Sequence, residues 1–441
     1  MFLNENVLKK LNETLTQSRK SHFNKNRIPD RKIASIEEFR SLPFTTKDDI
    51  INNSPNSFIC VPKKELYQYH DTFSFSGGSS VSWFTKSELI DCAKRINSGG
   101  IGFNEDDRVL IRFPYTLSTT AHFTHIAAQM KNACVIPTSS RNNITPFTRI
   151  VYMMKKLDVT VLATMPIQAL LIAETAQMMG YNLKSDFKAL RAIYTAGEAL
   201  TPSKRKLIEG MWGVPVYDYF STKEVGPVMI ECEHRNTHPL DDNFIFEVLD
   251  ENLNREVEFG KTGFLAITTL NKKATPLIRY LTGDRAKMIY KECSCGRKVS
   301  MEIEGRKRDS VVIKDREFDI WILEEMISYL PVNGMWLSVP YNNGIKFLIE
   351  KNEDDDEITG EMIKWLEENY RVPVFIDFVE KGALHSRYES LQKENEYRLK
   401  DRNFYMDFED IPYYSKSIGC AELFQKKILY RTNILFQKWK V

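Results

Sequence analysis

The sequence has 441 residues, of which 42% are hydrophobic and 27% charged, with a net charge of +2. A chain of this length is too long to fold around one compact core, so we expect two or more domains. The near-zero net charge gives no reason to expect a nucleic-acid partner. The sequence contains no apolar run of about 18 residues, so no membrane span is expected. The N-terminus lacks the basic segment of a secretory signal, and the seven cysteines fit a reducing compartment. A cytoplasmic protein is therefore expected.

The predicted elements of the first 304 residues alternate between strands and helices. Residues 1–40 should form polar helix packed on the main body. The expected strands are 109–113, 133–137 and 159–164, and the expected helices are 167–179 and 202–211. Such alternation predicts an α/β fold whose parallel sheets are covered by helices. Short strands and turns, such as 264–269, indicate a β-rich subdomain over about 230–304.

The pattern changes after Gly305. Helices over 318–330 and 357–370 flank strands, which predicts a small mobile α+β domain over 305–403. The last segment, residues 404–441, matches no pattern and is treated as an extension of unknown role.

Three short motifs carry candidate chemistry. Glu224 follows an aromatic and hydroxyl run, as suits a magnesium ligand near phosphates. Asp284 ends a Thr-Gly-Asp turn, where a carboxylate can accept hydrogen bonds from both ribose hydroxyls. Arg306 follows a glycine at the start of Gly-Arg-Lys-Arg-Asp, from which a guanidinium can reach a phosphate.

The order and spacing of these motifs resemble the adenylate-forming superfamily, and most closely its phenylacetate–coenzyme A ligase branch. The resemblance covers about residues 38–325. The other segments that match the family are 42–50, 226–248, 260–265 and 276–280. It implies a large N-terminal domain with a small mobile C-terminal domain. It also implies that Mg·ATP activates a small carboxylic acid, such as an aryl acid, to acyl-AMP with release of pyrophosphate. The acyl group then passes to the thiol of coenzyme A or of a carrier-protein phosphopantetheine.

The resemblance assigns a phosphate loop and an adenine-lining segment. The loop is Ser76-Gly77-Gly78-Ser79, whose glycines let backbone approach phosphate oxygens. It departs from the family because Ser79-Ser80 replaces the second Thr-Gly and the usual following lysine is absent. The adenine segment is Gly197-Glu198-Ala199, in which Ala199 replaces proline.

The same resemblance gives roles to the run before Glu224. Phe220 takes the place of the tyrosine that stacks on adenine, and Ser221 and Thr222 follow it along the nucleotide. Lys223 replaces a Ser or Thr, so it either meets the α-phosphate as a cation or marks decayed catalysis. Glu224 is the magnesium ligand, Asp284 the ribose ligand and Arg306 the hinge arginine, with Arg308 nearby.

A zinc site is expected from four residues that converge only in three dimensions. Cys293 and Cys295 lie two residues apart on a turn, and Cys232 and His238 lie in a segment that resembles cysteine-bearing members of the branch. Three thiolates and one imidazole suit a closed structural zinc site. His234 is a rival to His238, and free thiols with a solvent histidine remain the alternative.

The acid pocket is assigned by resemblance to residues 113–118 and the helix that follows. Tyr115 is kept, whereas Ser118 and His122 replace apolar or aromatic positions, which indicates a more polar pocket than one for phenylacetate. Helix-face packing is the alternative for His122 and His125. Ile167 and Gln168 stand where the branch has Ser-Tyr.

The C-terminal domain departs most from the family pattern. Asp315 replaces a glycine beside the expected pantetheine path, and Lys393, or else Lys400, is the candidate adenylation lysine. Two alternatives therefore stay open: an adenylating enzyme with an amine acceptor, and a catalytically weak nucleotide-binding interaction protein. The identity of the acid and the existence of a homodimer are also left open.

Overall fold

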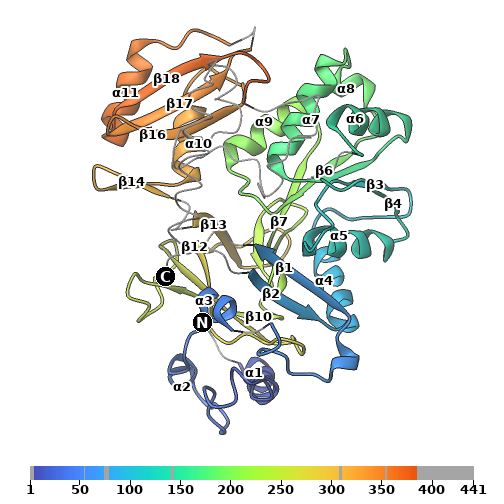
Figure 1. The fold of residues 1–441 in the computed structure, drawn as a ribbon, viewed down its shortest axis with the longest axis vertical. Helices are drawn as coiled ribbons and strands as arrows, with labels where there is room; N and C mark the ends of the chain where they lie inside the picture. The colour runs from blue at the N-terminus through green and yellow to red at the C-terminus, as the bar shows by residue number, and fades with distance from the viewer. Residues whose placement is uncertain are drawn as a thin grey trace, which may run out of the picture. The chain divides into compact units, whose positions relative to one another are not determined.

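A computed structural model describes residues 4–53, 55–73, 79–140, 144–306, 310–352 and 355–384. The chain divides into two compact units, Met1–Lys307 and Arg308–Val441 (Figure 1).

The first unit is built on a seven-stranded sheet with the order β4-β3-β5-β6-β7-β8-β9. Its strands are β3 (Arg108–Ile111), β4 (Cys134–Pro137), β5 (Val161–Thr164), β6 (Ala192–Ala196), β7 (Val216–Thr222), β8 (Gly226–Glu231) and β9 (Thr237–Pro239). The strands β3 to β7 pair in parallel, and β8 and β9 are added antiparallel. The predicted strands are confirmed, with their ends shifted by one or two residues.

Helices connect these strands, as parallel pairing requires. They are α5 (Thr119–Gln129), α6 (Phe147–Lys156), α7 (Pro166–Met178), α8 (Leu183–Asp186) and α9 (Pro202–Trp212), while α4 (Lys86–Asn97) leads into β3. Residues Pro166 to Ala176 of α7 are all buried. The predicted helices 167–179 and 202–211 correspond to α7 and α9. The α/β class of the large domain is therefore confirmed.

Two antiparallel sheets complete the core of this unit. A hairpin pairs β1 (Gln68–Phe73) with β2 (Ser79–Phe84). The expected β-rich region is a four-stranded sheet of β10 (Phe244–Leu249), β11 (Thr262–Thr269), β12 (Tyr280–Tyr290) and β13 (Val299–Arg306). One hydrophobic core runs through all of these sheets, from Val81 and Phe123 to Leu265 and Met301.

The N-terminal segment packs on the four-stranded sheet. It contains α1 (Glu5–Ser18), α2 (Ile36–Arg40), α3 (Lys47–Asn52) and the short 3₁₀ helix η1 (Lys63–Glu65). Leu11 and Leu15 of α1 are buried against Ile245 and Ile278. Packing of this polar helix on the main body is as predicted.

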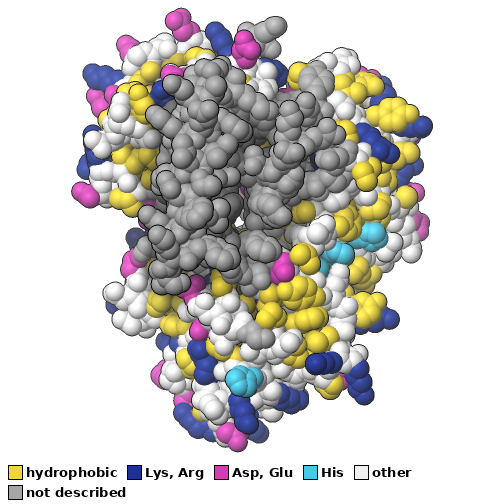
Figure 2. Space-filling model, in the orientation of Figure 1, with side chains coloured by type: hydrophobic (Ala, Val, Ile, Leu, Met, Phe, Trp, Pro, Cys, Tyr) yellow, Lys and Arg dark blue, Asp and Glu magenta, His cyan; other side chains and the backbone are white. Residues whose placement is uncertain are grey.

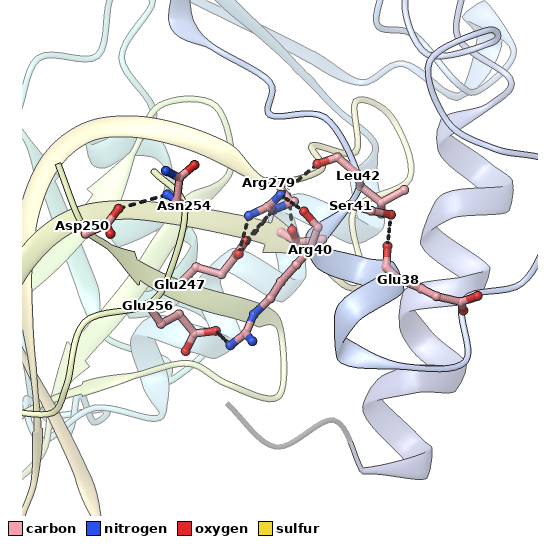
Figure 3. A network of polar contacts seen from close by, with 10 residues as sticks. Glu38, Arg40, Ser41, Leu42, Glu247, Asp250, Asn254, Glu256 and Arg279 are labelled. Carbon is pink, nitrogen blue, oxygen red and sulfur yellow. Dashed lines mark hydrogen bonds and ion pairs between the residues drawn. The ribbon is translucent and has the colours of Figure 1, made fainter. Parts of the chain in front are cut away.

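Arg279 holds this segment to the sheet through a buried network (Figure 3). Its guanidinium binds both oxygens of Glu247 at 2.8–3.2 Å and donates to the carbonyls of Arg40 and Leu42. The two side chains are 6% and 1% exposed, and the Phe44 ring lies 3.9 Å from the guanidinium carbon. Removing either partner would leave a buried charge unpaired, so this pair stabilises the attachment of the N-terminal segment to the sheet.

The second unit is a small α+β structure. A hairpin of β14 (Val311–Ile313) and β15 (Arg316–Phe318) leads to α10 (Ile320–Ser328). The strands β16 (Trp336–Tyr341), β17 (Gly344–Glu350) and β18 (Val374–Val379) form a three-stranded sheet, and α11 (Gly360–Tyr370) packs on it through Leu366. The two predicted helices correspond to α10 and α11.

The surface carries charges of both signs. Figure 2 shows Lys and Arg interspersed with Asp and Glu over the visible face. In the described part of the chain, no helix combines the length and the apolar character of a membrane span.

Candidate functional site

The turn between β7 and β8, residues 223–225, brings Glu224 into the core of the first unit. The Glu224 side chain is buried and accepts hydrogen bonds from the Ser80 hydroxyl on β2 and the Tyr280 phenol on β12. Burial alone would raise the pKa of Glu224, but the Ser80 hydrogen bond and the charge of Lys47 lower it below the ordinary value. Glu224 is therefore an ionised carboxylate, the form that binds magnesium.

Lys223, the preceding residue, points toward the β1–β2 hairpin. Its ammonium donates to the carbonyl oxygen of Asp71, and its own carbonyl accepts from the Ser82 hydroxyl at 2.9 Å. Lys223 therefore joins the turn to the hairpin, in addition to any contact with a phosphate.

Asp284 and Arg306 face one another across β12 and β13. The Arg306 Nε atom lies 2.5 Å from Asp284 Oδ1, and the two residues are register partners. Asp284 is 2% exposed, and its Oδ2 atom has no hydrogen-bond partner among the described residues. A buried carboxylate oxygen without a donor suits a ligand hydroxyl.

Two buried hydroxyl groups lie at the end of β7, just before Glu224. Ser221 Oγ and Thr222 Oγ1 are buried without hydrogen-bond partners in the described structure. Phe220, beside them, is half-buried and contributes to the main core. Tyr280 donates to Glu224, and Asp284 lies four residues further along the same strand, close enough for its charge to act on Tyr280. The predicted nucleotide residues on β7 and β12 thus fit a polar ligand.

The adenine segment lies in the loop after β6. Gly197 has a φ of +80°, and an added Cβ there would meet nothing within 4 Å, so only its backbone conformation requires glycine. The Glu198 carboxylate accepts from the Ile167 backbone N–H at 3.2 Å and lies 3.5 Å from Lys204 Nζ. Glu198 therefore anchors the N-terminus of α7 through its side chain. Only the backbone of residues 197–199 is then available to line a base.

The acid-pocket residues gather around a histidine cluster, which we define as His70, His122 and His125. Tyr115 Oη lies 3.0 Å from His125 Nδ1, and the Tyr115 carbonyl lies 2.9 Å from His122 Nε2. Ser118 is the N-cap residue of α5 but makes no side-chain cap hydrogen bond. The structure therefore brings Tyr115 and His122 together, and their role in an acid pocket stays a prediction.

Sequence reasoning missed three residues near these groups. His70 on β1 is 1% exposed, and its ring packs at 5.4 Å from that of His122. Gln68 Nε2 lies 3.1 Å from His122 Nδ1. Lys47, which lowers the pKa of Glu224, lies in the segment 42–50 that carried the resemblance and could have been singled out there. The other two depend on the strand pairing of β1, which no local pattern specifies.

The expected zinc ligands converge in the described structure. The ligand atoms of Cys232, His238, Cys293 and Cys295 all lie within 4.8 Å of one another. The Cys232 and Cys293 sulfurs are 3.7 Å apart, and Cys295 Sγ is 3.3 Å from His238 Nε2. For a tetrahedral site with bonds of about 2.3 Å to sulfur and 2.0–2.1 Å to nitrogen, these separations should be about 3.8 and 3.5 Å. The geometry therefore fits zinc.

The second nitrogen of His238 supports the same assignment. His238 Nδ1–H donates to the Val299 carbonyl at 2.6 Å, which leaves the Nε2 lone pair for a metal. The rival His234 has a half-exposed side chain that faces Glu233. His238 is thus the residue that fits.

Some predicted residues lie outside the described structure. They are Ser76, Gly77, Gly78, Arg308, Lys393 and Lys400, together with the extension 404–441. The backbone of Ser79 belongs to β2.

The sequence is similar to several curated enzymes. It is 29% identical over 287 residues to a phenylacetate–coenzyme A ligase of Thermus thermophilus, a match that spans 63% of either chain. It is 25% identical over 319 residues to one of Pseudomonas putida, spanning 71% of either chain, and 26% identical over 302 residues to one of Escherichia coli, spanning 67% of this chain and 68% of the relative. No protein-family model matches the sequence.

Solved structures share the fold. A 2-hydroxyisobutyryl–coenzyme A ligase in the postadenylation state superposes with a TM-score of 0.79 at 20% identity, covering 91% of this chain and 89% of that one. An anthranilate–coenzyme A ligase in complex with anthranoyl-AMP reaches 0.51 at 14% identity, covering 73% and 65%. The sequence is thus similar to phenylacetate–coenzyme A ligases, and the chain shares the fold of adenylate-forming coenzyme A ligases.

Proposed function

We propose that the protein activates a small carboxylic acid with Mg·ATP, forming acyl-AMP and releasing pyrophosphate. The observation that carries this proposal is the convergence of Glu224 and Asp284 on Tyr280, with Asp284 Oδ2 buried and lacking a partner in the described residues. The similarity to phenylacetate–coenzyme A ligases supports the same reaction.

Each residue around Tyr280 has a distinct role in this reaction. Asp284 accepts from the ribose hydroxyls, and Arg306 orients Asp284 from β13. Phe220 offers a flat face to adenine, and the Ser221 and Thr222 hydroxyls can meet polar atoms of the nucleotide. Glu224 would hold magnesium, which neutralises phosphate charge during attack by the carboxylate. Positioning and charge neutralisation then supply most of the catalysis.

The acceptor in the second half-reaction is proposed to be a thiol, either coenzyme A or a carrier-protein phosphopantetheine. The segment 305–403 would act as the hinge domain of the family, with Lys393 as the adenylation lysine. An amine acceptor is the second candidate, and Asp315 is the observation that favours it. Asp315 occupies a two-residue turn between β14 and β15, where its φ of +62° is a conformation that glycine adopts without strain.

Zinc is proposed as a structural metal of the four-stranded sheet. Its four ligands come from the end of β8, from β9 and from the turn between β12 and β13. Four protein ligands leave no open position for a substrate, so the metal would join two sheets and not take part in adenylation.

The proposed reaction is tested by pyrophosphate release across a panel of aryl and alkyl acids, with and without coenzyme A. We expect acid-dependent release with at least one member, and its loss in Glu224→Gln. Release that does not depend on the acid, or that Glu224→Gln leaves unchanged, would contradict the assignment. Release that stays stoichiometric until an amine replaces coenzyme A would favour the second candidate.

A further inference from the structure

We propose that His70 is a specificity-determining residue that selects acids carrying a neutral hydroxyl group beyond the reactive carboxylate. His122 is the residue that positions the His70 ring. This inference rests on the acid-activating function proposed above and adds the class of acid.

The histidine cluster lies between the acid segment and the turn that carries Glu224. His70 is followed by Asp71, whose carbonyl binds the Lys223 ammonium, and it pairs in register with Ser82, whose hydroxyl binds the Lys223 carbonyl. On the other side, α5 is held to β7 because Thr124 Oγ1 lies 3.2 Å from the Tyr219 hydroxyl. A group on His70 is therefore placed beside the reacting end of the site.

The orientation of His122 is fixed by two hydrogen bonds. Its Nε2 faces the Tyr115 carbonyl, which only accepts, so Nε2 carries the proton. Its Nδ1 lies 3.1 Å from the Gln68 amide nitrogen. Both nitrogens of His122 are thus used, and its ring packs edge-on against His70.

His70 differs because the described residues do not fill its hydrogen-bonding capacity. Its side chain is almost fully buried between Phe84, Phe123 and His122. The Leu117 carbonyl is the one acceptor that acts on the ring, and neither nitrogen makes a hydrogen bond of good geometry within the described structure. Burial and the nearby His122, Lys223 and Lys272 lower the pKa of His70 to about 4, against the opposing effect of the Leu117 carbonyl. His70 is therefore neutral at pH 7, and with one N–H facing the Leu117 carbonyl it leaves the other ring nitrogen as an unfilled acceptor.

These properties specify the chemistry of the ligand. A hydroxyl both donates and accepts, so it can satisfy either nitrogen of a neutral imidazole. A hydrocarbon substituent would leave a buried polar group unpaired, which is unfavourable. A second carboxylate can only accept, and it would place a charge beside aromatic rings and an uncharged imidazole. The structure therefore favours a hydroxy acid over either alternative.

The experiment compares matched acids with the full-length protein and Mg·ATP. Phenylacetate, mandelate, 4-hydroxyphenylacetate and phenylmalonate are assayed for pyrophosphate release, and kcat and KM are determined separately. One of the two hydroxylated acids should have a kcat/KM at least about tenfold above that of phenylacetate, since a site built to bind a hydroxyl discriminates strongly against its absence. In His70→Phe this preference should fall to less than about threefold, because the KM for the hydroxylated acid rises. The KM for ATP should be unchanged.

Two further variants keep the inference testable if His70→Phe does not fold. His122→Phe retains His70 but loses both hydrogen bonds that orient the His122 ring against it. This variant should therefore raise the KM for the hydroxy acid more than the KM for phenylacetate. His22→Phe is the matched control, because His22 is exposed on the N-terminal segment and should leave all four acids unaffected.

Several results would overturn the inference. Equal use of phenylacetate and both hydroxy acids would do so, as would a preference that survives unchanged in both His70→Phe and His122→Phe. Best use of phenylmalonate would point to Lys223 as the selecting group instead. Acid-independent release across the whole panel would overturn the proposed function itself, and the inference with it.

Discussion

Replacing Asp284 with alanine should weaken ATP binding while leaving the first unit folded. The carboxylate is 3% exposed and offers one oxygen to Arg306 and one to a ligand. Loss of hydrogen bonds to a charged group costs about 1.5–3 kcal/mol, which corresponds to about a 10- to 150-fold weaker affinity for ATP. The structural cost should stay below the 3–5 kcal/mol typical of breaking a fully buried pair, because the Arg306 side chain is 31% exposed and can be solvated.

Titration calorimetry with ATP and acid-dependent pyrophosphate exchange measure this effect. Asp250→Ala is the matched control, since Asp250 lies at the end of β10 in the same sheet and only accepts from the Asn254 and Arg255 region. Thermal unfolding checks that both variants are folded. If folded Asp284→Ala binds ATP and exchanges pyrophosphate like the unmodified protein, the ribose role of Asp284 is wrong.

Three further predictions address the metal, the acceptor and pH. Protein purified without chelator should contain one zinc per chain by elemental analysis. The double variant Cys293→Ser/Cys295→Ser should lose the zinc and melt at a lower temperature, whereas Cys134→Ser, at an exposed cysteine, should keep it. Full metal content in the double variant would refute the ligand set. Asp315→Gly should raise thioester formation with coenzyme A and leave pyrophosphate release unchanged, because it removes a carboxylate from the expected thiol path. If the unmodified protein already forms the thioester at an ordinary kcat of about 1–1000 per second, crowding by Asp315 is wrong. The pKa of His70 is lowered from 6.5 to about 4 on folding, so the unfolded chain binds the proton first as pH falls. Stability should therefore drop between about pH 6.5 and 4, and His70→Phe should make that drop shallower in denaturant titrations; identical slopes would contradict a neutral buried His70.

Much of the fold could be predicted because its strands are short apolar runs and its helices have clear ends. The strands β3, β4 and β5 and the helices α7 and α9 were found within one or two residues. The residues assigned to the nucleotide lie in contiguous motifs, so they could be proposed from the sequence, and their role stays a prediction. The histidine cluster was only half found, because His122 lies next to the acid segment whereas His70 reaches it through the pairing of β1 with β2. A pairing between strands depends on tertiary packing, so the neighbours of His70 could not be read locally.

The anchoring of the N-terminal segment by Arg279 has a consequence for how the chain can be shortened. Thr45 bonds with the backbone on either side of Tyr280, accepting from Leu281 N–H at 2.9 Å and donating to the Arg279 carbonyl at 3.2 Å. Tyr280 in turn holds Glu224, and Lys47 acts on the same carboxylate. The first fifty residues are therefore part of the support of Glu224, the proposed magnesium ligand, although they lie far from it in sequence. A protein that begins after residue 50 would keep the proposed nucleotide residues and still lose contacts that help to keep Glu224 ionised.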